Sequence, residues 1–180
     1  MNSTSVSLSH AADAGATPRQ CARITIGPAT LQDRQEIYRS RYAVYACELE
    51  QHAANGAGQL CDSLDQWNLY LVAKIDGEMA GFISVTPPGK PAYSIDKYLR
   101  REALPFHFDR MLYEVRLLTV LKAHRGREFA FLLMYAAFRW VEAHGGRRIV
   151  AIGRREILDL YLRVGLEPGR IFHSVRSGEL

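Results

Sequence analysis

Two stretches of the sequence combine residue types and spacings that suit chemistry. The first, Leu112 to Gly146, joins an apolar segment to a basic turn with Arg125 and Gly126, then to a long apolar segment that ends at paired glycines. These residue types predict a buried strand, a turn and a helix. A strand that enters a helix through such a turn directs backbone N–H groups and the positive end of the helix dipole at one place. Such a place can bind phosphate.

The second stretch contains two carboxylates, Asp62 and Asp65, just before an apolar segment that begins at Trp67. In a turn of helix, residues three apart share a face, and the two carboxylates could then hold a cation or an ammonium group. A solvated helix cap explains the same spacing, and these residues alone favour that alternative.

Length and composition indicate one globular domain. The chain has 180 residues, enough for one sizeable core. Residues 1–20 are rich in Ser, Ala and Thr, which predicts a disordered N-terminal tail followed by a single domain over residues 21–180. The net charge of +4 is too small to indicate nucleic-acid binding.

Other classes of protein are disfavoured by what the sequence lacks. The cysteines, Cys21, Cys47 and Cys61, are odd in number and show no CxxC spacing, so we expect no disulfide framework. The histidines show no metal-ligand spacing, and no metal is predicted. An export signal and an apolar run of about 18 residues are both missing, so we expect no membrane segment and a cytoplasmic location.

Turn and cap residues predict the elements that position these groups. Thr30 and Asp33 have the spacing of a capping box, so a helix should begin at Leu31. Asp76-Gly77 favours a two-residue hairpin turn. The predicted strands are residues 23–26, 69–75, 79–85, 113–121, 148–153 and 171–175, and the predicted helices are residues 31–47, 129 to the glycines at 145–146, and 155–164, with a short one near 95–102. This order predicts an α/β (α+β) fold in which helices flank a mixed central sheet.

Helical spacing along the first predicted helix separates a core face from a solvent face. Apolar and aromatic residues recur on one side, and core packing is their favoured explanation. The expected core side holds Leu31, Ile37, Tyr38, Tyr42 and Tyr45, and the expected solvent side holds Arg34, Gln35 and Arg39.

The element order and two motifs resemble the GNAT superfamily of acyltransferases. The segment Arg125-Gly126-Arg127-Glu128-Phe129-Ala130 is similar to the Q/R-x-x-G-x-G/A turn that binds the coenzyme A diphosphate in that family, with Glu128 where glycine is expected. Tyr161 to Leu166 is similar to the Y-x-x-x-G-F signature, whose tyrosine often protonates the leaving thiolate. The resemblance covers roughly Arg23 to Val175 and implies a GNAT-like acyltransferase fold.

The resemblance also implies roles in the donor site and in catalysis. The strand before the turn would bind the pantetheine on its backbone, which assigns Leu118 and Val120 to the donor site together with the turn. Glu114, on the same strand, becomes the candidate general base, and Tyr161 the candidate general acid. The alternatives are a solvent-facing residue or a partner of Arg116 for Glu114, and plain core packing for Tyr161.

A narrower resemblance is to acyl-homoserine lactone synthases and bacterial N-acyl amino acid synthases. Their R-x-x-x-F, D-x-x-D and E pattern is similar to Arg41 with Tyr45, Asp62 with Asp65, and Glu114. It implies that both aspartates seat the ammonium of an amino acid acceptor, and that Arg41 orders the loop or pairs with its carboxylate.

Two positions depart from the lactone-synthase pattern. Ser84 and Leu117 stand where that pattern has arginines. Arg116 is one residue out of register, which on a regular strand means the opposite face. The N-acyl amino acid synthase version depends less on these positions.

The sequence therefore predicts an enzyme, a GNAT-type N-acyltransferase that moves an acyl group from an acyl thioester to the amine of an amino-acid-like small molecule by direct attack. The donor is acyl-CoA or acyl carrier protein. Glu128 would repel a diphosphate, which favours the single phosphate of a carrier-protein arm. Basic residues that could meet the acidic surface of such a partner are Lys122, Arg125, Arg127, Arg147, Arg148, Arg154 and Arg155.

Two other functions remain open for the same fold. One is an acetyl-CoA-dependent N-acetyltransferase. The other is a non-catalytic GNAT-like module that binds an acyl ligand or docks on a partner. Neither nucleic acid nor membrane is an expected partner, and the oligomeric state is not predicted.

Overall fold

The computed structural model of the chain describes residues 22–126 and 128–168. The predicted tail over residues 1–20, the predicted strand over residues 171–175 and Arg127 lie outside the described residues.

Five of the six predicted strands lie in the described part of the chain, and they form one mixed sheet, which confirms the predicted sheet type. The strands lie in chain order across the sheet, the first four antiparallel and the last two parallel. Their bounds are β1 Ile24–Pro28, β2 Leu69–Ile75, β3 Glu78–Thr86, β4 Leu112–Val120 and β5 Arg148–Ala151.

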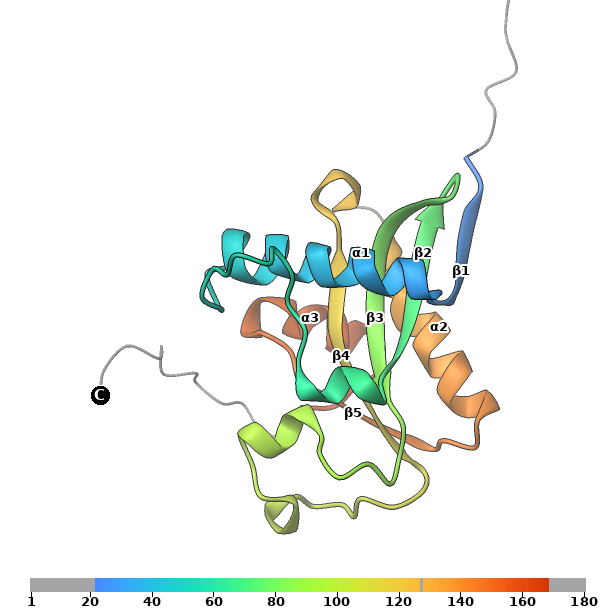
Figure 1. Ribbon diagram of the computed structural model, residues 1–180. Coiled ribbons are helices and arrows are strands. Elements are labelled where there is room, and N and C mark those ends of the chain that lie inside the picture. The colour runs from blue at the N-terminus through green and yellow to red at the C-terminus, as the bar shows by residue number, and fades with distance from the viewer. Residues whose placement is uncertain (1–21, 127, 169–180) are drawn as a thin grey trace, which may run out of the picture.

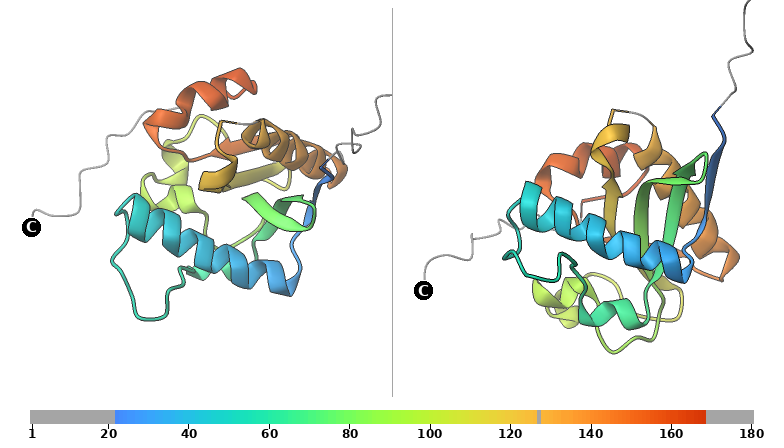
Figure 2. Two further views of the ribbon diagram at one scale, coloured as in Figure 1. Left: turned by 90° about the horizontal axis from the view of Figure 1, so that it is seen from above. Right: turned by 45° about the horizontal axis from the view of Figure 1, so that its top comes forward.

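Helices cover both faces of the sheet (Figures 1 and 2). α1 (Leu31–Arg41) crosses one face and continues directly into a π-helix, Tyr42–Glu48. α2 (Phe129–Ala143) lies on the other face, where α3 (Leu158–Arg163) also contributes to the core. The sheet therefore separates two apolar clusters, a large one under α2 and a smaller one under α1.

The capping box and the hairpin turn predicted from the sequence are both present. The Thr30 hydroxyl accepts from the Asp33 N–H at 3.1 Å, and the Asp33 carboxylate accepts from the Thr30 N–H at 2.9 Å, which completes the capping box. Asp76 and Gly77 have φ values of +51° and +92°, the left-handed conformation that a tight hairpin turn requires.

Two residues of the first helix lie on the opposite side from the prediction, while Ile37, Gln35 and Arg39 lie as predicted. Ile37 is fully buried, but Leu31 is 85% exposed. Arg34, expected in solvent, donates to the backbone oxygens of Asp65 and Asn68. These two expectations were wrong because the face that meets the sheet also carries arginines that bind the segment before β2.

A β-bulge interrupts β4. Phe82 pairs with Thr119 and Ser84 with Arg116, so β4 has one residue more than β3 over this interval. Leu117 takes up the extra residue with a φ of +56°. The bulge corrects the expectation that Arg116 and Leu117 lie on opposite faces of the sheet. Leu117 packs in the apolar cluster under α1, and Arg116 pairs with Asp62, which is also bound by Arg41 at the end of α1.

The long segment between β3 and β4 contains only short helical turns. They are 3₁₀ turns at Ser94–Lys97 and Arg101–Ala103, in place of the predicted helix near 95–102. In Figure 1 this segment lies below the sheet, beside the turn that precedes β2.

Candidate active site

An exposed length of strand edge follows the bulge. Within the described residues, β5 pairs only with residues 112–115 of β4, so residues 116–120 have no strand neighbour on that side. Leu118 and Val120, both predicted in the donor site, lie on this stretch and pack partly against the core under α2. This edge therefore offers backbone groups to an extended ligand. Two of its carbonyls, those of Leu117 and Val120, already accept from the Thr119 hydroxyl and from Arg125 Nε.

The edge leads into the start of α2. The turn between them contains Gly126 at a φ of +78°, and α2 begins at Phe129. No described side chain caps this helix, so the first N–H groups of α2, from Phe129 and Ala130 onward, lack a side-chain partner. The Phe129 ring is buried in the core, so at the helix start it is the backbone of Phe129 that can meet a phosphate.

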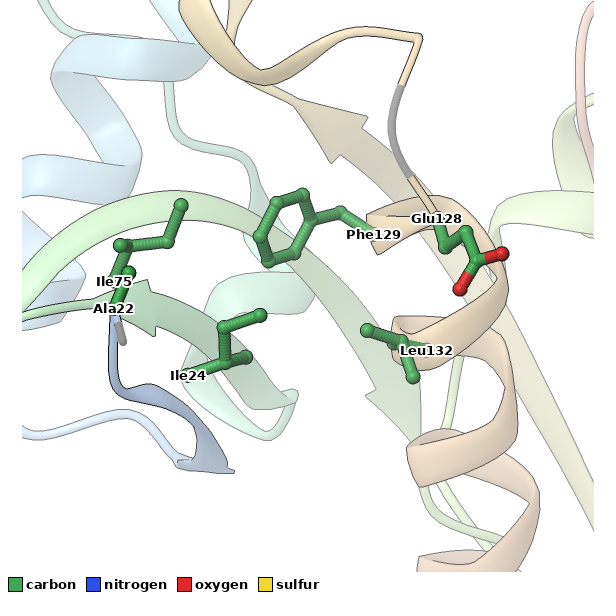
Figure 3. A pocket seen from close by; sticks show the side chains of 6 residues that line it. All are labelled: Ala22, Ile24, Ile75, Glu128, Phe129 and Leu132. Carbon is green, nitrogen blue, oxygen red and sulfur yellow. The ribbon is translucent and has the colours of Figure 1, made fainter. Parts of the chain in front are cut away.

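Glu128 lies at the side of a small pocket next to this helix start (Figure 3). The pocket has a volume of about 220 Å³, and its walls are apolar apart from Glu128. The Glu128 side chain is exposed, and its carboxylate has no hydrogen-bond partner among residues 22–126 and 128–168. The lining residues are Ala22, Ile24, Ile75, Glu128, Phe129 and Leu132.

Arg125 is bound by a carboxylate that the sequence did not indicate. Its two terminal nitrogens pair with the two oxygens of Glu48, and its Nε donates to the Val120 carbonyl at 3.2 Å. The pKa of Glu48 lies below its ordinary value, first because Arg125 hydrogen-bonds to it. A lone glutamate at the end of a helix carries no spacing signal, so this contact requires the fold.

Tyr161 lies on α3 and packs in the core under α2. Burial, together with the nearby Tyr45 hydroxyl, raises the pKa of Tyr161 to about 12. Gly153 is in direct contact with the ring, because a Cβ at that position would overlap it. The phenol is therefore held rigidly and stays protonated at neutral pH.

Tyr45 contacts β4 just after the bulge. Its hydroxyl is 3.0 Å from the Thr119 hydroxyl, which in turn donates to the Leu117 carbonyl at 3.0 Å. Tyr45 therefore donates to Thr119. The π-helix is thus fixed to the part of β4 whose edge is free.

Glu114 is fully buried, and both of its oxygens are occupied. It accepts from the backbone N–H groups of Ser94 and Ile95, both at 2.9 Å, from the Ser94 hydroxyl at 2.7 Å and from Thr86 at 3.3 Å. The carboxylate thus caps the first 3₁₀ turn of the long segment. Tyr113 and Val115 belong to the core that contains Tyr161, so alternation places Glu114 on the other face.

Arg41, Asp62 and Asp65 come together, as their shared motif implies. Arg41 contacts Asp65 at 2.7 Å, Asp62 at 3.1 Å and the Tyr70 hydroxyl at 2.9 Å. Arg116 pairs with the same oxygen of Asp62. Both aspartates also cap the turn between them, which is the cap that the sequence favoured.

Asp62 differs from Asp65 in keeping some exposure. Its side chain is 24% exposed, whereas that of Asp65 is 7% exposed. Burial by itself would raise the pKa of Asp62, but the hydrogen bond from Arg116 and the charges of Arg116 and Arg41 outweigh it and lower the pKa. Asp62 therefore remains charged and is the accessible anion of the cluster.

Several buried donors beside this cluster have no partner in the described part of the chain. They include Arg41 Nε, Arg116 Nη1 and Asn68 Nδ2, and the Ser84 hydroxyl is unpaired as well. Buried polar groups in folded proteins are almost always satisfied by protein or by water, so these donors call for an acceptor, either a bound water or a ligand atom. Sequence reasoning missed Asn68 because it stands alone before an apolar strand.

The described residues contain neither a membrane-spanning helix nor a cluster of metal ligands. None of the described helices is long and apolar enough to cross a membrane. Residues 22–126 and 128–168 contain no group of three or more His, Cys, Asp or Glu side chains that could hold a metal ion.

Comparison with known proteins identifies the family. A model of the acetyltransferase (GNAT) family matches residues 30–166, and the chain belongs to this family. A comparison with curated proteins finds no match.

Solved structures of several acyltransferases share the fold. A ribosomal-protein-alanine N-acetyltransferase from Brucella melitensis biovar Abortus 2308 is 21% identical, with a TM-score of 0.58 over 85% of this chain and 98% of that one. A GNAT family acetyltransferase from Brucella melitensis in complex with acetyl-CoA is 22% identical, with a TM-score of 0.57 over 81% and 83%. A CoA-dependent acyl-homoserine lactone synthase, BjaI, with SAM and isopentyl-CoA, is 19% identical, with a TM-score of 0.65 over 79% and 72%.

Proposed function

We propose that the protein is an N-acyltransferase that takes an acyl group from a coenzyme A thioester and transfers it to the amine of a small molecule. The observation that carries the proposal is the free edge of β4, residues 116–120, which leads into the uncapped start of α2. An extended amide chain suits the edge, and phosphate suits the helix start and Arg125. The family match and the relative in complex with acetyl-CoA support this donor.

Tyr161 acts on the leaving sulfur as a hydrogen-bond donor. A phenol with a pKa of about 12 is fully protonated at pH 7. A thiol has a pKa of about 8.5, so complete proton transfer from this phenol to a thiolate is uphill. Tyr161 therefore stabilises the negative charge that develops on sulfur, and the proton comes from the attacking nitrogen, which must lose one once it has bonded to the carbonyl carbon.

Glu114 positions the acceptor side of the site. Its carboxylate already accepts from four groups, so taking a proton from an amine would disrupt the turn that it caps. The role of general base assigned to it by the sequence stays a prediction. The Glu114→Gln variant tests that role directly.

Asp62 and the unpaired donors around Arg116 suit an acceptor that carries both an ammonium and a carboxylate. Asp62 offers an accessible negative charge. Arg116 Nη1 and Asn68 Nδ2 offer unsatisfied donors for an anionic oxygen. An amino-acid-like acceptor provides both groups, whereas a simple amine provides only one.

A second candidate is transfer of a longer acyl chain, with acyl carrier protein as donor. The cluster of Arg41, Asp62 and Asp65 favours it, because this is the motif of the narrower resemblance. The lactone synthase named above also shares the fold, although at 19% identity it supports the fold alone. Short and long donors therefore have to be compared in one assay.

Release of free thiol tests the proposal. The wild type is incubated with acetyl-CoA, long-chain acyl-CoA or acyl carrier protein, with amino acids and with the matching amines that lack the carboxylate. We expect amine-dependent thiol release, faster with the amino acids. Turnover of acetyl-CoA alone eliminates the long-chain candidate, and binding of acyl-CoA without turnover with any acceptor supports the non-catalytic module instead.

A further inference from the structure

Arg125 is engaged by a carboxylate from a distant part of the chain. Glu48, the last residue of the π-helix, meets both terminal nitrogens of the guanidinium, one of them at 2.8 Å. The two side chains are 40% and 37% exposed. A pair with this exposure contributes little to stability and opens easily.

Two further cations lie near Glu48, and one of them, Arg154, also contacts Glu156 at 3.9 Å. Besides the hydrogen bonds from Arg125, the charges of Lys122 and Arg154 act on it in the same direction. Lys122 follows β4, and Arg154 follows β5. Three cations therefore gather near the carboxyl ends of the two parallel strands, beside the uncapped start of α2, and Glu48 neutralises part of that charge.

The position of Glu48 is fixed by its own helix. Tyr45, three residues earlier, is hydrogen-bonded to Thr119 on β4. A π-helix turn at this point brings Tyr45 to the strand and Glu48 to the turn after it. π-helical turns are rare and occur mostly at functional sites.

We propose that Glu48 is a specificity-determining residue of the donor site, which holds Arg125 in the free protein and competes with the donor's phosphate for that guanidinium. This inference rests on the proposed function, because it takes the turn at Arg125 as the phosphate site. The guanidinium fork binds a carboxylate and a phosphate with the same two nitrogens, so the two acceptors exclude each other.

Competition by Glu48 depends on the charge of the donor. Once displaced, its carboxylate lies next to the bound phosphates, and the repulsion increases with their charge. Coenzyme A carries a diphosphate and a 3′-phosphate, whereas 4′-phosphopantetheine carries one phosphate. Glu48 therefore weakens the binding of coenzyme A more than the binding of phosphopantetheine.

Calorimetric titration with coenzyme A and with 4′-phosphopantetheine tests this inference. We expect Glu48→Gln to tighten coenzyme A about three- to tenfold and phosphopantetheine by a smaller factor. In an Arg125→Gln background, the effect of Glu48→Gln should fall below about twofold, because the competition acts through Arg125. Glu142→Gln, which removes an exposed carboxylate paired with Arg139 near the other end of α2, is the matched control and should change neither affinity.

The possible results separate this inference from the proposed function. If Glu48→Gln leaves coenzyme A binding unchanged or weakens it, Glu48 does not compete with the phosphate. The same conclusion follows if Glu48→Gln increases the affinity for coenzyme A as much in the Arg125→Gln background as in the wild type. If Glu48→Gln increases the affinity for coenzyme A and for 4′-phosphopantetheine by the same factor, Glu48 does not determine specificity. If neither the wild type nor Glu48→Gln binds either ligand at millimolar concentration, the donor site itself is wrong. Thermal melts of each variant confirm that it is folded.

Discussion

Single residues of the candidate site differ in whether they can still meet a ligand. Glu114 and Asp65 are buried, and their oxygens are occupied by other parts of the chain. Asp62 and Arg125 keep exposed surface, although each has an internal partner. Positioning is therefore expected from the first two, and contact with substrates from the others.

Glu114→Gln should destabilise the protein by about 2 kcal/mol, because an amide leaves at least one of four buried donors unsatisfied. Urea unfolding measures this change, with Glu142→Gln as an exposed control. If Glu114 positions the acceptor, the KM for the amine rises while the shape of the kcat–pH profile is retained. Loss of the acidic limb of that profile without a change in stability would instead identify Glu114 as the base.

Asp62→Asn should cost about 1–3 kcal/mol at neutral pH, because Arg41 and Arg116 lose a shared anion. The folded pKa of Asp62 is depressed, so its stabilising contribution is present above the ordinary carboxyl pKa and is lost as the pH falls through the folded pKa. The variant should therefore lose less stability than the wild type below about pH 4. Parallel acid profiles for the two proteins would contradict this expectation.

Tyr161→Phe should lower kcat and leave the pH profile below pH 10 unchanged, because this phenol does not ionise in that range. The raised folded pKa also predicts a stability effect. The contribution of Tyr161 is fully present below the unfolded pKa of about 10 and is lost as the pH rises through about 12. Between pH 9 and pH 11, the free energy of unfolding measured with denaturant should fall less for Tyr161→Phe than for the wild type. An equal fall would show that the pKa of Tyr161 is not raised in the folded protein.

The strands and helices that hold the site follow from local sequence signals to different degrees. The hairpin turn at Asp76-Gly77, the capping box at Thr30 and the sequence of strand, turn and helix from β4 to α2 all rest on neighbouring residues. The bulge at Leu117 and the π-helix have no such signal, because a leucine at positive φ is held there by pairing with other strands.

The contact between α3 and the loop that follows β5 allows a test that leaves the tyrosine unchanged. A Cβ at Gly153 would overlap the Tyr161 ring. Gly153→Ala should therefore displace the phenol and reduce kcat nearly as far as Tyr161→Phe, with a further loss of about 1–3 kcal/mol from overpacking. Gly56→Ala, where a Cβ meets nothing within 4 Å, is the matched control for activity and unfolding. Full activity in Gly153→Ala would show that the position of the ring is unimportant.

At the scale of the whole molecule, the residues proposed to bind the acceptor and the residue proposed to act on the leaving sulfur lie on opposite faces of the sheet. The cluster around Asp62 lies on the α1 face, Tyr161 packs under α2, and the free edge of β4 lies between them. The sequence predicted the mixed sheet and the residues of both groups. The motif implied that Arg41 meets the two aspartates. The contacts of Glu48 with Arg125 and of Asp62 with Arg116 could not be predicted, because they join segments 77 and 54 residues apart.

Hydrogen exchange with and without coenzyme A tests the central claim, that the free edge of β4 and the start of α2 bind the donor. We expect slower amide exchange in residues 116–120 and in the first turn of α2 when coenzyme A is present, and unchanged exchange at the hairpin turn of Asp76 and Gly77. Binding of coenzyme A with protection elsewhere, and none along this edge, would contradict the account.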